Sequence, residues 1–73
     1  MEISVSSKIK LYLNDKGIKQ KYLAEQVGIN ENHLSMILNN KATLDMDLYL
    51  KIIRVLKVDA NTFINSNLTY IEN

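Results

Sequence analysis

The amino-acid sequence predicts an all-α fold, a bundle of five short helices. Three observations support this prediction: proline is absent, glycine occurs twice in 73 residues, and apolar residues recur at steps of three and four. Such spacing gathers apolar side chains on one face of a helix. Because a chain of this length cannot divide its core, we expect a single domain over residues 1–73. Its core would span about residues 6–65, followed by a tail over residues 66–73.

The first two helices are expected on either side of Gly17. One is predicted over about residues 7–16, where Ser6 would accept a hydrogen bond from a first-turn amide and Gly17 would close the helix in the left-handed conformation. The other is predicted over about residues 20–27 and ends at Gly28. The buried faces of these two helices are expected to carry Ile9, Tyr12, Leu13, Leu23, Ala24 and Val27.

Asparagine and aspartate mark the starts of three further helices, because their short side chains accept hydrogen bonds from free first-turn amides. Asn30 would cap the third helix, and Asp45 opens a fourth whose wide apolar face predicts a central position. Asp59 would cap a short fifth helix that ends near Asn65, and residues 66–73 favour an extended strand. The third helix has an inward stripe of Leu34, Ile37 and Leu38, and the fourth has apolar residues at Met46, Leu48, Tyr49, Leu50, Ile52, Ile53, Val55 and Leu56.

Composition excludes several classes of site. Without cysteine the chain has no disulfide, thiolate metal site or cysteine nucleophile, and one histidine is too few for a histidine-based metal site. No glycine-rich loop that would cradle a phosphate is present, so we expect neither a cofactor nor an enzymatic activity. No apolar run approaches the roughly 18 residues that cross a bilayer, and the N-terminus lacks the pattern of a signal peptide. A soluble, cytoplasmic protein without a membrane partner is therefore expected.

The formal charge of +1 does not by itself indicate a nucleic-acid partner. Residues 1–41 carry six lysines against four acidic residues, whereas residues 42–73 carry three basic against four acidic residues. Positive charge is thus concentrated in the first part of the chain. An imbalance of this size also occurs in domains that bind no nucleic acid, so function has to be inferred from motifs.

Residues 20–40 carry the most specific pattern in the chain. Two helices joined by a very short connection cross steeply, which requires a small residue where they pack closest and a turn residue free to adopt positive φ. Ala24 and Gly28 meet these two needs. The apolar anchors that share one core are Leu23, Ile29, Leu34 and Ile37. Together these six positions resemble the helix-turn-helix of the Cro and λ-repressor-like family, also called the XRE family, of small bacterial and phage regulators.

The resemblance extends over about residues 6–65, because the family's domain is a bundle of five helices with the helix-turn-helix in the second and third. The segment over residues 48–64 is similar to the family's last two helices at Leu56, Val58, Asp59 and Phe63. Asparagine tolerates the left-handed conformation, so the departures from the family pattern predict local repacking rather than another fold. Those departures are Leu38, Asn40, Leu44 and Ile53, where many members have an acidic residue, a glycine, a proline and a small residue.

The resemblance implies a sequence-specific DNA-binding transcriptional regulator, expected to be a repressor of phage or prophage origin. Its partner would be double-stranded DNA, bound by a homodimer at an inverted repeat. The third helix would read base edges in the major groove, and lysines, amides and helix N-termini around it would contact phosphates. The expected base-reading residues are Glu31, Asn32, His33, Ser35 and Met36. The expected phosphate-contacting residues are Lys19, Gln20, Lys21, Asn39, Asn40 and Lys41, and the expected dimer interface comprises Ile64, Leu68, Tyr70 and Ile71.

Each of these assignments has an alternative. The alternative for Glu31 is that it only stabilises the helix dipole as a first-turn acid, and Met36 would either touch a thymine methyl or pack against the first helix. The polar residues and lysines could be merely solvated, and the tail could fold over its own core instead of forming a dimer surface. For the whole protein, the alternative is a protein-interaction module on the same fold, acting as an antitoxin, an antirepressor or an inhibitor of another regulator.

Overall fold

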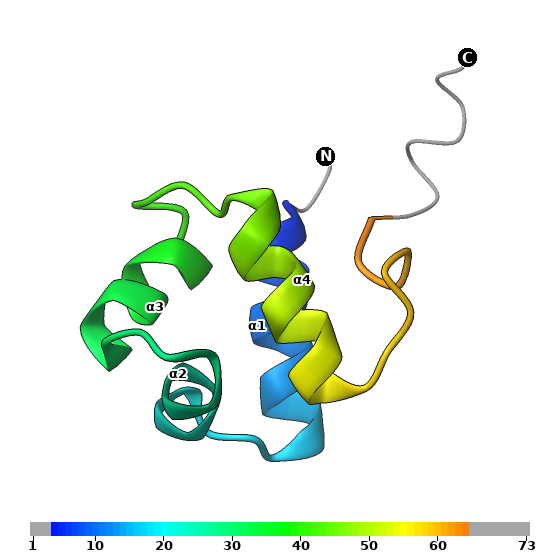
Figure 1. The fold of residues 1–73 in the computed structure, drawn as a ribbon, viewed down its shortest axis with the longest axis horizontal. Helices are drawn as coiled ribbons and strands as arrows, with labels where there is room; N and C mark the ends of the chain where they lie inside the picture. The colour runs from blue at the N-terminus through cyan, green and yellow to red at the C-terminus, as the bar shows by residue number, and fades with distance from the viewer. Residues whose placement is uncertain (1–3, 65–73) are drawn as a thin grey trace.

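The computed structural model describes residues 4–64, and in that range the chain forms four helices (Figure 1). Helix α2 packs against both α3 and α4, and α1 packs against α3. The predicted all-α architecture is confirmed over these residues. Within the same range, no helix has both the length and the apolar character that a membrane span needs. The helices are α1 (Val5–Lys16), α2 (Gln20–Val27), α3 (Glu31–Leu38) and α4 (Met46–Leu56).

Helix α1 begins earlier than the sequence predicts. Ser4 is its N-cap, because the Ser4 Oγ accepts a hydrogen bond from the Ser7 backbone N–H at 3.0 Å. Ser6, which was expected to be the cap, lies inside the helix and is buried. All three serines are competent caps, so packing decides between them: a start at Ser4 places Val5 against the core.

Two glycines end helices in the left-handed conformation, as predicted. Gly17 has φ 70°, and its N–H donates to the Asn14 carbonyl at 3.2 Å. Gly28 has φ 82°, and its N–H donates to the Ala24 carbonyl at 2.9 Å. Glycine reaches these angles without the steric cost that a Cβ brings. The Ile29 N–H also donates to the Ala24 carbonyl at 3.0 Å, so backbone bonds hold the turn between α2 and α3.

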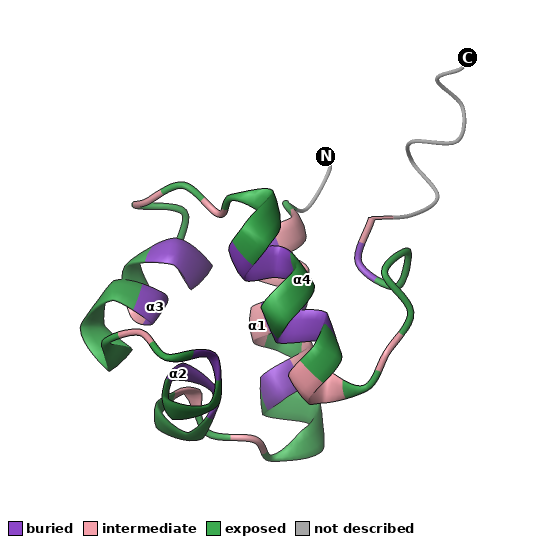
Figure 2. Cartoon of the chain, in the orientation of Figure 1, coloured by how far each residue is buried: buried purple, intermediate pink, exposed green. Residues whose placement is uncertain are grey.

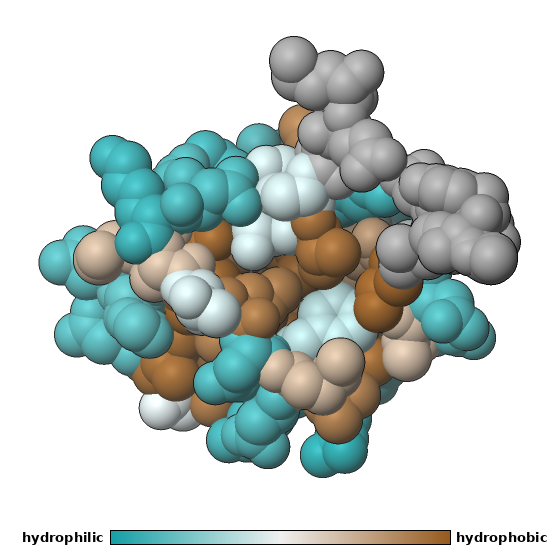
Figure 3. All heavy atoms as spheres, turned by 90° about the horizontal axis from the view of Figure 1, so that it is seen from above, coloured by the Kyte–Doolittle hydropathy of each residue, from teal (hydrophilic) through white to brown (hydrophobic). Residues whose placement is uncertain are grey.

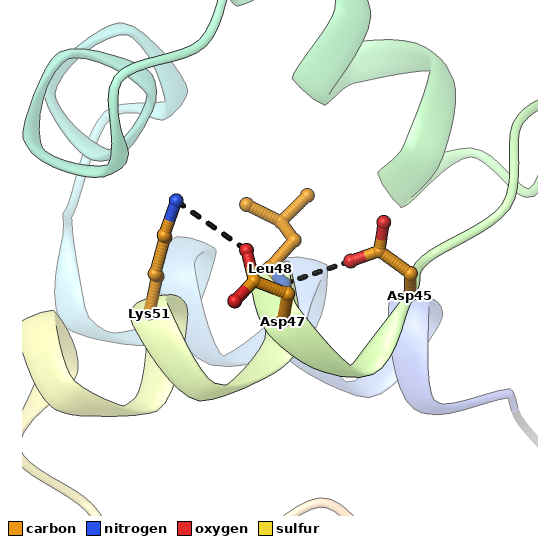
Figure 4. Close-up of polar contacts among 4 residues, drawn as sticks. All are labelled: Asp45, Asp47, Leu48 and Lys51. Carbon is orange, nitrogen blue, oxygen red and sulfur yellow. Dashed lines mark hydrogen bonds and ion pairs between the residues drawn. The ribbon is translucent and has the colours of Figure 1, made fainter.

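Helix α4 starts at the cap that the sequence predicts. The Asp45 carboxylate accepts a hydrogen bond from the Leu48 N–H at 2.8 Å, and Asp47 forms an ion pair with Lys51 at 3.4 Å (Figure 4). A cap of this kind contributes about 1 kcal/mol, whereas an exposed ion pair one turn apart contributes about 0.3–0.5 kcal/mol. The helix ends at Leu56, and its C-cap Lys57 takes the left-handed conformation at φ 59° although it is not glycine.

The prediction of a fifth helix is wrong over the described residues. After α4 the chain forms turns: the Asp59 carboxylate accepts from the Asn61 N–H at 2.8 Å, and the Asp59 carbonyl accepts from the Thr62 N–H at 2.9 Å. A bond from an aspartate side chain to the backbone N–H two residues ahead is compatible both with a helix cap and with a turn, and here the chain forms the turn. Asn65, where the helix was expected to end, and the tail over residues 66–73 lie outside the described residues.

The segment after α4 completes the core through its side chains. Phe63 is buried and meets the Tyr12 ring edge to face, with ring centroids 5.5 Å apart. The buried Tyr49 hydroxyl donates to the Ala60 carbonyl at 2.5 Å. Burial raises the pKa of the Tyr49 hydroxyl, a backbone hydrogen bond from Phe63 opposes this, and the negative charge of Asp59 raises it further. The segment is therefore fixed by an aromatic contact and a buried hydroxyl.

The inward faces of all four helices form one core (Figure 2). The inward stripes predicted for α2 and α3 are confirmed, and in α1 Ile9 and Leu13 are buried while Tyr12 is half-buried. Burying one large apolar side chain contributes about 1.5–3 kcal/mol. Helix α4 has a narrower buried face than expected, because Met46 and Leu50 are exposed. The most deeply buried large side chains are Ile9, Leu13, Leu23, Leu34, Ile37, Leu38 and Ile52.

Candidate nucleic-acid interface

Helix α3 presents two chemically different faces. Its inner face is closed, because Leu34, Ile37 and Leu38 are at most 1% exposed. Its outer face is mostly exposed (Figure 2), and the expected base-reading residues are exposed or half-buried. A helix that is anchored on one side and polar on the other is suited to a major groove, which is wide enough to admit it. Of the five expected residues, Glu31, Asn32, His33 and Met36 are exposed and Ser35 is half-buried.

The polar side chains at the start of α3 have no partners within the described part of the chain. Asn30 caps the helix by accepting a hydrogen bond from the Asn32 backbone N–H at 2.7 Å. This bond uses only the backbone of Asn32. Among residues 4–64, the side chains of Glu31, Asn32 and His33 make no hydrogen bond or ion pair. The Asn32 amide therefore offers a donor and an acceptor together, the pair that the edge of adenine accepts.

The start of α2 lacks the side-chain cap that the other three helices have. Serine, asparagine and aspartate side chains cap α1, α3 and α4, whereas Lys19 at the N-cap of α2 makes no such bond. First-turn amides without an intramolecular acceptor carry the positive end of the helix dipole, which attracts anions. Lys19 and Lys21 are exposed at this end and Gln20 is half-buried. Three expected phosphate-contacting residues thus surround the open end of α2.

The starts of α2 and α3 border one surface hollow. Two of the expected site residues line this hollow: Gln20, expected to contact phosphate, and Glu31, expected to read a base. Glu31 also lies in the first turn of α3, where a carboxylate stabilises the dipole. The other lining residues are Leu13, Asn14, Gly17, Ile18 and Lys19.

Side-chain hydrogen bonds that the sequence did not predict join the C-terminal end of α3 to α1. The Asn39 Nδ2 donates to the Ser35 carbonyl at 2.8 Å, and the Asn39 Oδ1 accepts from the Lys10 Nζ at 2.6 Å. Both polar atoms of the Asn39 amide are therefore engaged within the protein. Lys41, two residues further along the chain, is exposed, and its backbone N–H donates to the Met36 carbonyl at 2.8 Å.

Asn40 makes a second set of contacts with α1. Its backbone has φ 64°, the left-handed conformation that asparagine tolerates. Its Oδ1 accepts from the Ser4 Oγ at 2.9 Å, and its Nδ2 donates to the Ser7 Oγ at 3.1 Å. Asn39 and Asn40 were expected to contact phosphates. In the structure, their side chains hold α1 against the end of α3, and phosphate contact stays a prediction.

Ser4, Ser7 and Lys10 were not expected from the sequence to contribute to this end of α3. These residues follow one another at intervals of three, so they lie along one face of α1. That spacing predicts a polar stripe on α1 and could have been noticed in the sequence. The partners could not have been named, because the contacts with Asn39 and Asn40 span 29 to 36 residues.

Ile64 is the member of the expected dimer interface that lies within the described residues. It is half-buried and lines a mainly apolar hollow. Figure 3 views the molecule from the side on which α4 begins and shows apolar atoms in the middle of that face. Leu68, Tyr70 and Ile71 lie outside the described residues. The hollow is also lined by Val5, Leu44, Asp45, Met46 and Tyr49.

Potential metal ligands are not gathered in the described part of the chain. Within residues 4–64, no three histidine, aspartate or glutamate side chains are placed to hold a metal ion. The surface around α3 offers amides, one imidazole and several ammonium groups. These are groups that form hydrogen bonds with base edges and phosphates.

Comparison with known proteins adds one finding. A family model described as Helix-turn-helix matches residues 9–63. The match begins at Ile9 and ends at Phe63, two residues of the core, and it contains both α2 and α3. Among curated proteins and among solved structures, no significant match is found.

Proposed function

The chain belongs to the helix-turn-helix family of the Cro and λ-repressor-like type, and from this premise we propose that it is a sequence-specific regulator of transcription. In this proposal the protein acts in the cytoplasm as a repressor, and it binds double-stranded DNA at an inverted-repeat operator that overlaps a promoter. It uses no cofactor and catalyses no reaction. Helix α3 is its recognition helix, the helix that enters the major groove.

The exposed polar face of α3, above a fully buried inner face, is the observation that carries the proposal. Asn32 reads adenine through its unpartnered amide, and His33 donates to or accepts from a neighbouring base edge. Met36 is 46% exposed and supplies an apolar contact to a thymine methyl. Glu31 accepts from cytosine, and the Ser35 hydroxyl is the remaining polar group on this face. Buried Leu34, Ile37 and Leu38 hold all of these groups in position.

Phosphate contacts are proposed at both ends of this surface. The uncapped start of α2 points its amides and positive dipole at one phosphate, with Lys19, Gln20 and Lys21 around it. Lys41 supplies an ammonium group beyond the other end of α3, next to the backbone and amide groups of Asn39 and Asn40. Contacts of this kind fix the register of a protein on DNA without reading sequence.

The proposal is tested by selection from a pool of randomised DNA duplexes. The purified protein is mixed with the pool, the retained duplexes are sequenced, and the selection is repeated at higher salt. The expected result is an inverted repeat with half-sites about one helical turn apart, bound less tightly as salt rises. Absence of retention even at low salt would overturn the proposal.

Two substitutions separate base reading from phosphate contact. Asn32→Ala is expected to cost about 1–3 kcal/mol of binding free energy on the selected duplex and to relax preference at one base position. Lys21→Ala is expected to weaken binding to all sequences about equally. The control is Lys51→Ala, which removes an exposed ammonium on α4 and should leave DNA affinity unchanged. If neither Asn32→Ala nor Lys21→Ala changed affinity, α3 would not be the recognition helix.

A dimer is part of the proposal, because an inverted repeat matches the twofold symmetry of a protein dimer. Ile64, Leu68, Tyr70 and Ile71 are proposed to form its interface, and the support within the described residues is the apolar hollow beside Ile64. Sedimentation equilibrium of the full chain, alone and with the selected duplex, is expected to show two copies on one DNA. A single copy in both states would refute the dimer and leave DNA binding standing.

The second candidate function, a module that binds another protein, is favoured by apolar side chains on the surface. Formal charge is only +1, and several large apolar side chains face solvent. An apolar protein interface changes much less with salt than a DNA complex does. Outside α3, the exposed large apolar residues are Leu11, Tyr22, Met46 and Leu50.

A further inference from the structure

Lys10 belongs to α1, yet its ammonium group lies at the C-terminal end of the recognition helix. The Lys10 Nζ donates to the Asn39 Oδ1 at 2.6 Å, and Asn39 is the C-cap of α3. The Asn39 amide is itself held, because its Nδ2 donates to the Ser35 carbonyl at 2.8 Å. A flexible lysine side chain is thus fixed by an asparagine that is bonded to the helix carrying the base-reading residues.

The charge of Lys10 is not neutralised by a carboxylate within the described residues. Over residues 4–64 the single ion pair is the one between Lys51 and Asp47. An ammonium group has three donors, and Asn39 takes one of them from Lys10. Two donors and a full positive charge therefore remain for an anion, and exposed Lys41 adds a second positive charge just beyond Asn39 in the chain.

We propose that Lys10 binds a DNA phosphate and that Asn39 positions its ammonium group for this contact. The proposal rests on the proposed function, because it requires α3 to enter a major groove. The ends of a helix lying in that groove come close to the sugar–phosphate backbone, where ammonium groups are the usual contacts. The Asn39 Oδ1 is an acceptor and cannot bind a phosphate oxygen, so that atom acts through Lys10.

A structural role for Lys10 makes a different prediction. A cation at the C-terminal end of a helix stabilises the exposed carbonyls and the negative end of the dipole. If that were its whole role, removal of the charge would lower stability and would leave the salt dependence of DNA binding unchanged. The two roles are therefore distinguished by the slope of log affinity against log salt, which counts phosphate contacts.

The experiment uses the full chain and two probes, a 30-base-pair duplex of mixed sequence and the duplex recovered by selection. Lys10→Gln is expected to weaken binding to both probes by roughly three- to tenfold at low salt and to lower the salt slope by about one. Lys10→Arg keeps the charge and should keep the slope. Lys16→Gln is the matched control, because Lys16 lies on the same helix but over the Tyr12 ring, and it should change neither quantity. Thermal unfolding of each variant verifies that it is folded.

Asn39→Ala tests the positioning role. It is expected to weaken DNA binding in the wild-type chain and to have a much smaller effect in the Lys10→Gln chain, because the two residues act through one contact. Equal effects in both backgrounds would show that Asn39 acts independently of Lys10 and would overturn the positioning role.

The outcomes separate this inference from the proposed function. If the wild-type chain binds neither duplex at low salt, the proposed function fails and the inference fails with it. If the wild-type chain and Lys16→Gln bind with a steep salt dependence and Lys10→Gln has the same slope, only the inference is overturned. The same holds if Lys10→Gln lowers the unfolding temperature and leaves the slope unchanged.

Discussion

The two ends of α3 are held by different kinds of interaction. At the N-terminal end, Gly28 turns the chain through a backbone bond to Ala24, and Asn30 caps the first turn of the helix. At the C-terminal end, the side chains of Asn39 and Asn40 bond to α1 across 29 to 36 residues. The first end is fixed by residues adjacent in sequence, and the second is fixed by the packed bundle.

This difference means that the orientation of α3 has two separate determinants. The turn and the cap set the direction in which α3 leaves α2, and they do so through bonds between residues that are close in sequence. The bonds from Asn39 and Asn40 set the position of α3 against α1, and they exist only when the bundle is assembled. Substitutions at the two ends are therefore expected to differ in size and in kind.

The largest effect is expected from Gly28→Ala at the local end. Gly28 has φ 82°, and beyond its own local backbone and its two chain neighbours no atom lies within 4 Å of the position that a Cβ would take, so the cost is local backbone strain. We expect the free energy of unfolding to fall by about 1–2 kcal/mol. Urea unfolding followed by circular dichroism measures this change, with Gln26→Ala on the exposed face of α2 as the control. A loss no larger than that of the control would contradict a local determinant at this turn.

Two substitutions at Asn40 sharpen the comparison at the other end. Asn40→Gly and Asn40→Ala both remove the hydrogen bonds to Ser4 and Ser7. At φ 64°, alanine carries a steric strain that glycine does not. The alanine variant is expected to be less stable than the glycine variant by about 1 kcal/mol in urea unfolding. Both variants should show faster amide hydrogen exchange at the end of α3 than the wild-type chain. Unchanged exchange there would refute the role of the side-chain bonds.

Asn30→Ala is expected to lower the free energy of unfolding by about 1 kcal/mol, because a first-turn amide of α3 loses its acceptor. Thermal unfolding provides the measurement. Asn32→Ala is a matched control two residues away, since the Asn32 side chain makes no bond within the described residues. Indistinguishable unfolding temperatures for these two variants would show that the Asn30 cap contributes nothing.

Tyr49→Phe has the smallest expected effect and extends the comparison to a second contact between distant elements. Loss of the bond to the Ala60 carbonyl is expected to cost about 0.5–1 kcal/mol at neutral pH. Burial raises the pKa of Tyr49 above its ordinary value of 10.0. The contribution of Tyr49 to the stability of the fold is therefore complete below pH 10.0 and is lost as pH rises through the folded-state pKa.

Urea unfolding at a series of pH values from neutral to alkaline tests this dependence. The wild-type chain should lose stability above about pH 10 more steeply than Tyr49→Phe does. Parallel loss in the two chains would show that Tyr49 titrates in the folded and unfolded states alike.

The features that could be predicted from the sequence are those controlled by neighbouring residues. The bounds of α2, the left-handed Gly28 and the caps at Asn30 and Asp45 all follow from local side-chain chemistry and helical periodicity. The fifth helix was mispredicted because Asp59 has two local options, a helix cap or a turn. In the structure the segment after α4 forms the turn and also contacts Tyr12 and Tyr49. No local sequence pattern reveals these contacts.

In the candidate site, too, some features follow from neighbouring residues and others depend on tertiary packing. The polar outer face of α3 was predicted because Leu34, Ile37 and Leu38 define the opposite face by their spacing. The position of Lys10 was not predicted, because its partner Asn39 belongs to another helix end and is chosen by tertiary packing. Sequence periodicity thus identifies which residues face outward, and packing decides which of them meet.

The edge-to-face contact between Tyr12 and Phe63 joins the first helix to the last described turn. In an unfolded chain, closing so long a loop costs about 3–4 kcal/mol of conformational entropy. One aromatic pair contributes only about 0.5–1.5 kcal/mol beyond its burial. After α1 to α4 have packed, only the short segment that follows α4 remains to be ordered, and the same contact forms far more easily. Phe63 is therefore expected to dock late in folding, onto a bundle in which α3 is already in place.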